Sequence, residues 1–364
     1  MKIPPAFDAK LTKIFSVIKI DEPLALHTTI GVGGPAARLV TATTAEQLQQ
    51  GLQLAYLFNL PVFVLGWGSN LIVSDHGFPG LVIKNRAQHW QVIEELPPVK
   101  NAAEIASSTS SRLACVGEDY YQIDDLMYSE ASAPSVIVQV ESGAKIDPLM
   151  KALFRHGLTG LQWFAGIPAT VGGAVYMNMH GGYHFFGDMV ERALLFESQP
   201  GMRSKSEATV SPHGGCKQVT QAYFQFEYDR SILQQTKETV LWAQLRLFRG
   251  DVQRARATAR EWARRKALQP QRSAGCIFRN LTLAQQKQLN LPTPSLGYLV
   301  EHVLKLKGTR RGEAVISPRH AAFIENLGQA RAQEVKELID LIKTRARAEL
   351  ALELEEEIEY LGEF

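Results

Sequence analysis

Apolar positions in the first hundred residues follow first a helical and then a strand pattern. Between residues 36 and 60, apolar side chains recur with a helical period, at Ala45, Leu48, Leu52, Ala55 and Leu57. Pro61 follows, and short apolar runs then predict buried strands at Val62–Leu65, Leu71–Val73 and Leu81–Ile83. The sequence Gly66–Asn70 (GWGSN) therefore lies between two predicted strands, whereas a Rossmann or P-loop glycine motif opens a helix.

The middle of the chain mixes loops and strands. Residues 97–134 have weak periodicity and a polar, serine-rich composition, which predicts an inserted surface loop. A strand is predicted at Val136–Val140. A helix is predicted at Asp147–His156, with Asp147 as N-cap, Pro148 at its first position and Gly157 after its end. Residues 190–248 indicate short strands with turns at 200–201 and 212–215.

Two long helices dominate the last third of the chain. Residues 251–267 predict a strongly basic helix, and residues 330–352 predict an amphipathic helix with Val335, Leu338 and Ile342 on its apolar face. The change in composition places a domain boundary near residue 250. The expected domains are 1–250, in two subdomains at about 1–95 and 135–250, and 251–364.

Composition narrows the class of protein. A chain of 364 residues is long enough for two domains, and the net charge of 39 − 37 = +2 argues against a strongly basic nucleic-acid binder. Three widely spaced cysteines (Cys115, Cys216, Cys276) argue against a disulfide framework, and no histidines pair at metal-ligand spacing, so we expect no metal. Without a signal segment or a long apolar run, we expect a cytoplasmic protein without membrane insertion.

Two glycine-rich loops are the first candidate site. In Gly66–Asn70 and Gly166–Ala174, small residues let backbone amides converge on an anion, and Ser69, Asn70 and Thr170 add side-chain donors. The alternative for either loop alone is a tight turn with close backbone packing. Two such loops on one chain, neither predicted to open a helix, favour a dinucleotide site that is not of the Rossmann type.

Other candidates are ionisable side chains in the last third. Arg256, Arg260 and Arg264 share one helix face and suit a diphosphate; the alternatives are a solvated face or a nucleic-acid patch. Cys276 follows two small residues and suits a nucleophile or acid, although a lone cysteine is more often a buried apolar residue. In the acidic tail, the alternation around Glu357 indicates a strand with Glu357 on a buried or cleft-facing side.

Seven short motifs, in order, resemble a known enzyme family. The chain is similar to UDP-N-acetylenolpyruvoylglucosamine reductase, in the shorter of its two architectures, which lacks a tyrosine-bearing loop. The motifs are HTTIGVGGPA (27–36), LGWGSNLIVSDHGFPGLVI (65–83), GLTGLQWFAGIPATVGGAVYMN (157–178), FEYDRSIL (226–233), QPQRSAGCIFRN (269–280), KGTRRGEAVISPRHAAFIENLG (307–328) and EEEIEYLG (355–362).

The resemblance implies an α+β fold: an FAD-binding domain of the vanillyl-alcohol-oxidase (PCMH) type in two subdomains, then an α+β substrate-binding domain. It implies non-covalent FAD, NADPH as reductant, a UDP-sugar substrate used in peptidoglycan synthesis, and no nucleic-acid partner; we expect a monomer. The implied FAD-binding residues are Gly66, Trp67, Gly68, Ser69, Asn70, Gly166, Ile167, Pro168, Thr170, Gly172, Gly173, Ala174 and Val175.

The resemblance also assigns roles around the substrate. Cys276 holds the position at which the family commonly has a proton-donating serine, and an accessible thiol there also predicts sensitivity to peroxide. Glu357 would help to stabilise the enolate, and Arg230 is the candidate cation beside the carboxylate. The implied substrate-binding residues are Asn280, His320, Arg260 and Arg264.

The sequence departs from the family pattern at several places. Asp229 separates Tyr228 from Arg230, where the family has tyrosine directly followed by arginine, so Arg230 needs a local bulge to reach the site. Trp67 replaces a glycine, Met179-His180 interrupts small residues, and residues 97–134 are longer than the family's loop. Two alternatives are another FAD oxidoreductase of the same fold and a catalytically inactive nucleotide-binding homologue.

Overall fold

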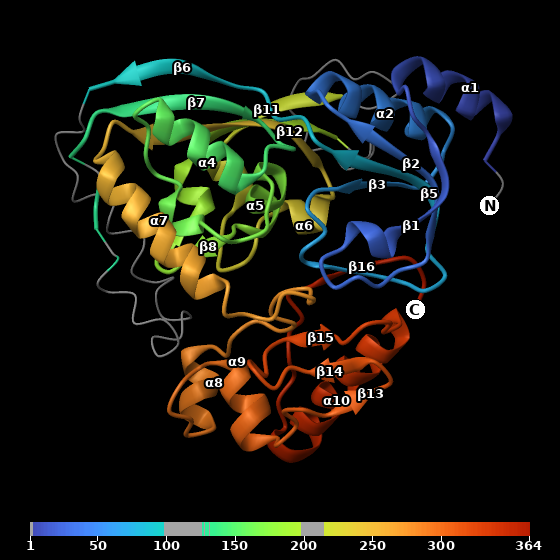
Figure 1. The fold of residues 1–364 in the computed structure, drawn as a ribbon, viewed down its shortest axis with the longest axis vertical. Coiled ribbons are helices and arrows are strands. Elements are labelled where there is room, and N and C mark those ends of the chain that lie inside the picture. Colours follow the sequence, from blue (N-terminus) through green and yellow to red (C-terminus); the bar gives the residue numbers. More distant parts are fainter. Residues whose placement is uncertain (1–2, 98–125, 127, 131, 198–214) are drawn as a thin grey trace.

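The fold consists of three lobes that meet around a common centre (Figure 1). The structure is a computed structural model, and it describes residues 3–97, 126, 128–130, 132–197 and 215–364. Most of the predicted insertion, together with the turns predicted at 200–201 and 212–214, lies outside the described residues. We call residues 3–87 the first lobe, the described part of residues 88–266 the second lobe, and residues 267–358 the third lobe.

The first lobe is a mixed sheet covered by two helices (Figure 1). Its strand order is β1 (Lys19–Pro23), β2 (Pro35–Ala42), β5 (Phe78–Asn85) and β3 (Val62–Leu65). β1 runs antiparallel to β2, whereas β2 and β3 are parallel to β5. The helices α1 (Pro5–Ile14) and α2 (Ala45–Leu57) pack on this sheet through a shared apolar core.

The helical pattern expected within 36–60 is confirmed only from Ala45 onward. The Thr44 hydroxyl accepts the Gln47 amide at 3.1 Å and starts α2 there. The preceding residues form β2, which is hydrogen-bonded on both edges and has a mostly buried apolar pattern. In the sequence, the apolar residues of a short strand just before a helix can be mistaken for the first turns of that helix.

The second lobe is an antiparallel sheet of five strands. Its order is β11 (Cys216–Thr220), β10 (Val190–Phe196), β12 (Thr239–Phe248), β7 (Ser135–Glu141) and β6 (Trp90–Leu96). The helices α4 (Ile146–Arg155), α5 (Val171–Met177) and α7 (Val252–Lys266) lie over one face of it (Figure 1). The short helix α6 (Leu233–Thr236) and the hairpin of β8 (His180–Gly181) and β9 (His184–Phe185) complete the lobe.

Two helix starts differ from the predictions. α4 begins at Ile146 with Lys145 as N-cap, because the Asp147 carboxylate instead accepts the amide of Gly166 at 3.0 Å. The second glycine loop does open a helix, since the Thr170 hydroxyl caps α5 by accepting the amide of Gly173 at 3.3 Å. Both changes tie the second glycine loop to a helix end.

The predicted basic helix is confirmed as α7. It packs with the residues that precede it, although the domain boundary was expected near residue 250. Ala255, Ala259 and Trp262 are buried in the core beneath the second sheet. α7 therefore packs as part of the second lobe. The sequence placed the boundary before it because the charged face of the helix changes the local composition. The chain enters the third lobe only after this helix.

The third lobe is a small α+β unit. It contains α8 (Leu283–Gln288), α9 (Leu296–Tyr298), a π-helical turn (Leu299–Val303), the sheet β13 (Arg310–Arg311), β14 (Ala314–Ile316) and β15 (Ile324–Asn326), and α10 (Ala332–Leu350). α10 confirms the amphipathic helix predicted at 330–352. The chain then returns to the first lobe, where β16 (Glu359–Leu361) pairs in parallel with β4 (Leu71–Val73). Among the helices in the described ranges, none has the length and apolar character to cross a membrane.

The end of the predicted surface loop packs against the second lobe. Glu130 is 7% exposed, and its carboxylate accepts the Gln162 side-chain amide at 2.9 Å. The same amide donates to the Tyr128 hydroxyl at 3.1 Å, and the Arg254 guanidinium lies 3.9 Å from the centre of the Tyr128 ring. Residues 128–130 are therefore anchored in the lobe, which corrects the prediction of a surface loop for this part of 97–134.

We expect Glu130→Ala to destabilise the protein measurably. The change leaves the buried Gln162 amide without its carboxylate acceptor, and such a loss lowers the free energy of unfolding by about 1–3 kcal/mol. Glu95→Ala is the control: its side chain is 62% exposed and pairs with Arg249 at the surface, so we expect a change below about 1 kcal/mol. Urea unfolding followed by circular dichroism measures both, and equal effects would contradict the anchoring role.

Candidate active site

A cavity of about 1260 Å³ lies where the three lobes meet. Its walls come from both glycine-rich loops, the Tyr228-Asp229 turn, the end of α7, the Ser273–Cys276 loop and the tail around Glu357. A pocket for one drug-sized ligand holds roughly 300–1,000 Å³. The cavity therefore has room for a large cofactor and part of a second ligand.

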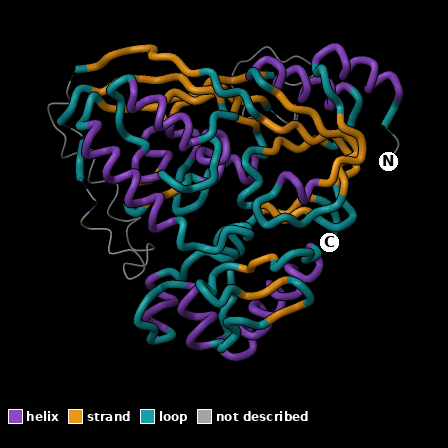
Figure 2. Tube along the Cα trace, in the orientation of Figure 1, coloured by secondary structure: helices purple, strands orange, loops and turns teal. Residues whose placement is uncertain are grey.

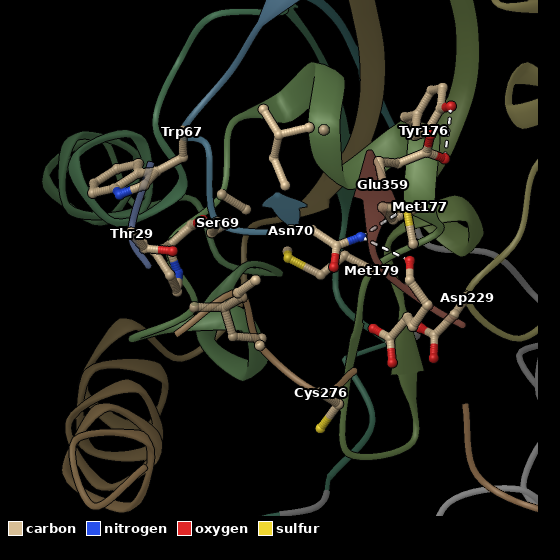
Figure 3. Close-up of a pocket in the computed structure, with 18 of the residues that line it drawn as sticks. Thr29, Trp67, Ser69, Asn70, Tyr176, Met177, Met179, Asp229, Cys276 and Glu359 are labelled. Atoms are coloured by element: carbon tan, nitrogen blue, oxygen red, sulfur yellow. Dashed lines mark hydrogen bonds between the residues drawn. The ribbon is translucent and has the colours of Figure 1, made fainter. Parts of the chain in front are cut away.

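The first glycine loop forms one wall of the cavity. All of its residues from Gly66 to Asn70 line the cavity, and Figure 3 shows Trp67, Ser69 and Asn70 in succession along it. Gly68 has a φ of +78°, and a Cβ there would lie 2.2 Å from the carbonyl oxygen of His27, so only glycine fits. The Ser69 hydroxyl donates to the carbonyl of Pro168 at 2.6 Å and so joins the two loops.

Most of the second loop lines the same cavity. The predicted residues found there are Gly166, Ile167, Pro168, Thr170, Gly172 and Gly173. Ala174 and Val175 are the exceptions: they do not line the cavity, because they lie on the inner face of α5 and are fully buried in the core of the second lobe. Their small, apolar character serves helix packing and not ligand contact.

The two loops together fit the pyrophosphate of FAD. A Cβ on Gly66 would lie 2.7 Å from the Thr170 hydroxyl oxygen, so the loops approach each other at glycine positions. Backbone at such positions is open to a phosphate, and hydroxyl and amide side chains on the same loops add hydrogen-bond donors. Gly66–Asn70 and Gly166–Gly173 are therefore the residues that would hold the pyrophosphate.

Backbone hydrogen bonds place Cys276 and Glu357 side by side. The amide of Glu357 donates to the carbonyl of Ile277 at 2.9 Å, and the amide of Ile277 donates to the carbonyl of Ala322 at 3.0 Å. The Asn70 side chain donates to the carbonyl of Glu357 at 3.0 Å, so the first glycine loop holds the tail segment. Both predicted catalytic residues line the cavity.

Burial holds protons on both side chains. It raises the pKa of the Cys276 thiol, and the nearby Glu357 raises it further. Burial also raises the pKa of Glu357 well above its usual range, with Asp229 as the second cause. Both side chains therefore keep their protons to higher pH than exposed ones do, and the scarcity of thiolate at Cys276 argues against the peroxide sensitivity expected from the sequence.

The structure brings the predicted Asn280 and His320 to the third-lobe side of the cavity. The Asn280 amide donates to the Tyr228 hydroxyl at 3.3 Å. His320 lies against Gly297, where a Cβ would come within 2.8 Å of the ring, so glycine is needed to admit it. Burial and then Lys266 lower the pKa of His320 to about 4, so its imidazole is neutral at pH 7.

The structure does not bring Arg230 to the cavity, and the expected bulge is not formed. Residues Glu227–Arg230 form a tight turn in which the two end residues exchange backbone hydrogen bonds. Asp229, at a φ of +49°, is 3% exposed and takes the position facing the cavity. The Arg230 side chain points away, is 41% exposed and pairs with Glu355.

Arg260 and Arg264 also lie away from the cavity. Arg264 is 65% exposed and pairs with Glu261 on the same helix at 2.6 Å, and Arg260 is exposed on α7. Lys266, the last residue of α7, lines the cavity instead. The sequence argument followed the row of arginines and passed over Lys266, a cation at the end of the helix, two residues beyond that row.

We expect Lys266, and not the two arginines, to control substrate affinity. Lys266→Met removes a cation from the cavity wall and should raise KM for an anionic nucleotide substrate by roughly 10- to 100-fold. Arg260→Ala and Arg264→Ala are the controls, and both should change KM by less than about threefold. Steady-state kinetics decide the matter, and a larger effect of either arginine would restore the original assignment.

Two family models match the chain. The C-terminal domain of UDP-N-acetylenolpyruvoylglucosamine reductase matches residues 268–361, and an FAD-binding domain matches residues 127–197. The enzyme of that name from Syntrophus aciditrophicus is 30% identical over 371 positions, covering 100% of this chain and 99% of the relative. The chain belongs to the UDP-N-acetylenolpyruvoylglucosamine reductase family. The Synechococcus enzyme is 32% identical over 361 positions, covering 98% of this chain and 95% of the relative.

A solved structure supports the same assignment. The crystal structure of UDP-N-acetylenolpyruvylglucosamine reductase from Thermus caldophilus matches with a TM-score of 0.63 and 28% identity. The match covers 95% of this chain and 98% of that chain. The chain is thus an FAD-dependent oxidoreductase, and the predicted PCMH-type FAD domain followed by a C-terminal α+β domain is confirmed.

Proposed function

We propose that this protein reduces UDP-N-acetylenolpyruvoylglucosamine to UDP-N-acetylmuramate for peptidoglycan synthesis, with NADPH as the reductant. One observation supports this most: Cys276 and Glu357, two acids whose pKa values are raised by burial, lie together in the cavity that the two glycine loops border. Reduction of an enol ether needs a proton donor at carbon and a group that stabilises an enolate oxygen. Family membership supports the same reaction.

The overall reaction balances as one hydride and one proton added across a carbon–carbon double bond. FAD held by the two glycine loops would provide the hydride chemistry at the methylene carbon, with NADPH as the source of the hydride. Cys276 delivers the proton to the neighbouring carbon, its S–H bond breaks as a C–H bond forms, and the thiolate then recovers a proton from water. Glu357, as a neutral acid, donates a hydrogen bond to the enolate oxygen while negative charge develops there.

Three cavity residues would position the rest of the substrate. Lys266 offers a cation to the diphosphate, while Asn280 and the neutral His320 offer hydrogen bonds from the third lobe. Because these groups come from different lobes, substrate binding would draw the third lobe against the FAD-binding lobes. That closure would exclude water from the reacting atoms.

A two-step spectroscopic experiment tests the proposal. The purified holoenzyme should be yellow, should be bleached by NADPH without oxygen, and should regain its colour when the enolpyruvyl substrate is added. Bleaching without recovery would indicate an FAD oxidoreductase with another substrate. Failure to bleach with either NADPH or NADH would indicate a catalytically inactive homologue.

A further inference from the structure

Two departures from the family pattern meet in the cavity. His180 interrupts the small residues that follow the second glycine loop, and Asp229 is the residue that displaces Arg230. They are 49 residues apart in the chain, yet Nδ1 of His180 lies 2.9 Å from the Asp229 carboxylate, and both residues line the cavity. We propose that His180, held by Asp229, binds the substrate's carboxylate in place of an arginine; this rests on the proposed function.

Neighbouring contacts fix the position of the pair. The side chain of Asn178 donates to the carbonyl of Glu227 at 2.6 Å, and the Ser231 hydroxyl donates to the carbonyl of Tyr176 at 2.6 Å. These bonds, one on each side of the His180–Asp229 contact, hold the segment after α5 against the Glu227–Arg230 turn. The Tyr228 ring packs at 5.0 Å from the imidazole, centre to centre. The imidazole is therefore held at both its polar edge and its face.

The remaining polar atom of His180 is available to a ligand. Nδ1 is engaged with Asp229, and no residue in the described part of the chain hydrogen-bonds to Nε2. The His180 side chain is 28% exposed on the cavity wall. A carboxylate acceptor at Nδ1 fixes the ring and leaves Nε2 as the atom that meets the substrate.

The contact between Asp229 and His180 shows how the histidine would take the place of an arginine. The second carboxylate oxygen of Asp229 is buried and has no hydrogen-bond partner among the described residues. A buried carboxylate needs a polar partner, and Nδ1 of His180, 2.9 Å away, is a partner that the structure gives it. In the proposed complex the imidazole lies between Asp229 and the substrate carboxylate, with Nδ1 toward the first and Nε2 toward the second.

The test compares two ligands that differ only in the carboxylate-bearing group. The enolpyruvyl substrate carries it, and UDP-N-acetylglucosamine has the same nucleotide and sugar without it. In calorimetric titration of the oxidised holoenzyme without NADPH, His180→Gln should weaken binding of the enolpyruvyl substrate by roughly 10- to 100-fold. Binding of UDP-N-acetylglucosamine should change by less than about twofold.

Two further variants separate positioning from folding. Asp229→Asn keeps a residue that tolerates positive φ but removes the carboxylate that holds the imidazole. It should therefore weaken binding of the enolpyruvyl substrate by roughly 3- to 10-fold, with the same selectivity. If His180→Gln loses its bound FAD, Asp229→Asn can still be used to compare the two ligands. His156→Gln, at an exposed histidine of α4 outside the cavity, should leave both affinities unchanged.

The outcomes distinguish this inference from the proposed function. Equal losses for both ligands, or no loss in His180→Gln, would overturn the role of His180 while leaving the proposed function in place. If the wild-type protein itself failed to prefer the enolpyruvyl substrate, the proposed function would fail instead. A loss confined to the ligand that carries the carboxylate supports both.

Discussion

Cys276→Ala should abolish reduction of the enolpyruvyl substrate while leaving reduction of the flavin by NADPH intact. Only the second half-reaction places a proton on carbon, and loss of a general acid lowers such a step by roughly 10²- to 10⁴-fold. Because burial keeps the thiol protonated, the proton is already in place before the substrate enters. Stopped-flow measurement of the two half-reactions under anaerobic conditions separates them directly.

Two variants serve as controls for this result. Cys276→Ser keeps a hydroxyl of similar size as a proton donor and should retain at least about a tenth of the wild-type rate. Cys216→Ala changes an exposed cysteine on β11 outside the cavity and should leave both half-reactions unchanged. Normal reoxidation by the substrate in Cys276→Ala would assign the proton to another group.

Much of the fold could be predicted from local patterns. The runs at Val62–Leu65 and Leu71–Val73 match β3 and β4, and the amphipathic pattern of residues 330–352 matches α10. These elements have a clear apolar period and sharp ends. The prediction was wrong where long-range packing decides: β2 is a strand because neighbouring strands flank it, and the buried face of α7 packs in the core of the second lobe.

The glycine loops, Cys276 and Glu357 could be located from sequence because each lies in a short, recognisable motif. The sequence could not locate side chains whose direction changes when the chain shifts by one residue. Asp229 lies within the Glu227–Arg230 turn, Arg230 points to the surface, and no periodic pattern reveals that turn. The His180–Asp229 contact, across 49 residues, depends in the same way on tertiary structure.

Glu357→Ala should lower kcat for substrate reduction by at least about 100-fold, the scale of losing one group that stabilises transition-state charge. Glu357→Gln should lose less than about tenfold, because its amide is neutral and still donates a hydrogen bond. Glu356→Gln is the matched control: its carboxylate pairs with Lys343 at 2.6 Å and does not line the cavity, so the rate should stay within about twofold. Equal losses in the Gln and Ala variants at Glu357 would show that the ionised carboxylate is required.

The pH dependence of the same step shows whether Glu357 acts as the neutral acid or as the carboxylate. Its pKa is raised, by burial first and by Asp229 second, so the acid form persists at pH values where an exposed glutamate is ionised. If the acid form is the working one, the rate falls as pH rises through this raised pKa, and Glu357→Gln lacks that fall.

Asp229→Asn, measured at saturating substrate, should move this fall in rate to lower pH. It removes one of the two main causes of the raised Glu357 pKa. The raised pKa of Cys276 places the thiol's own ionisation above its ordinary range, so a fall between the ordinary carboxyl and thiol ranges belongs to Glu357. A rate that rises with pH over that interval would instead make the carboxylate the active form.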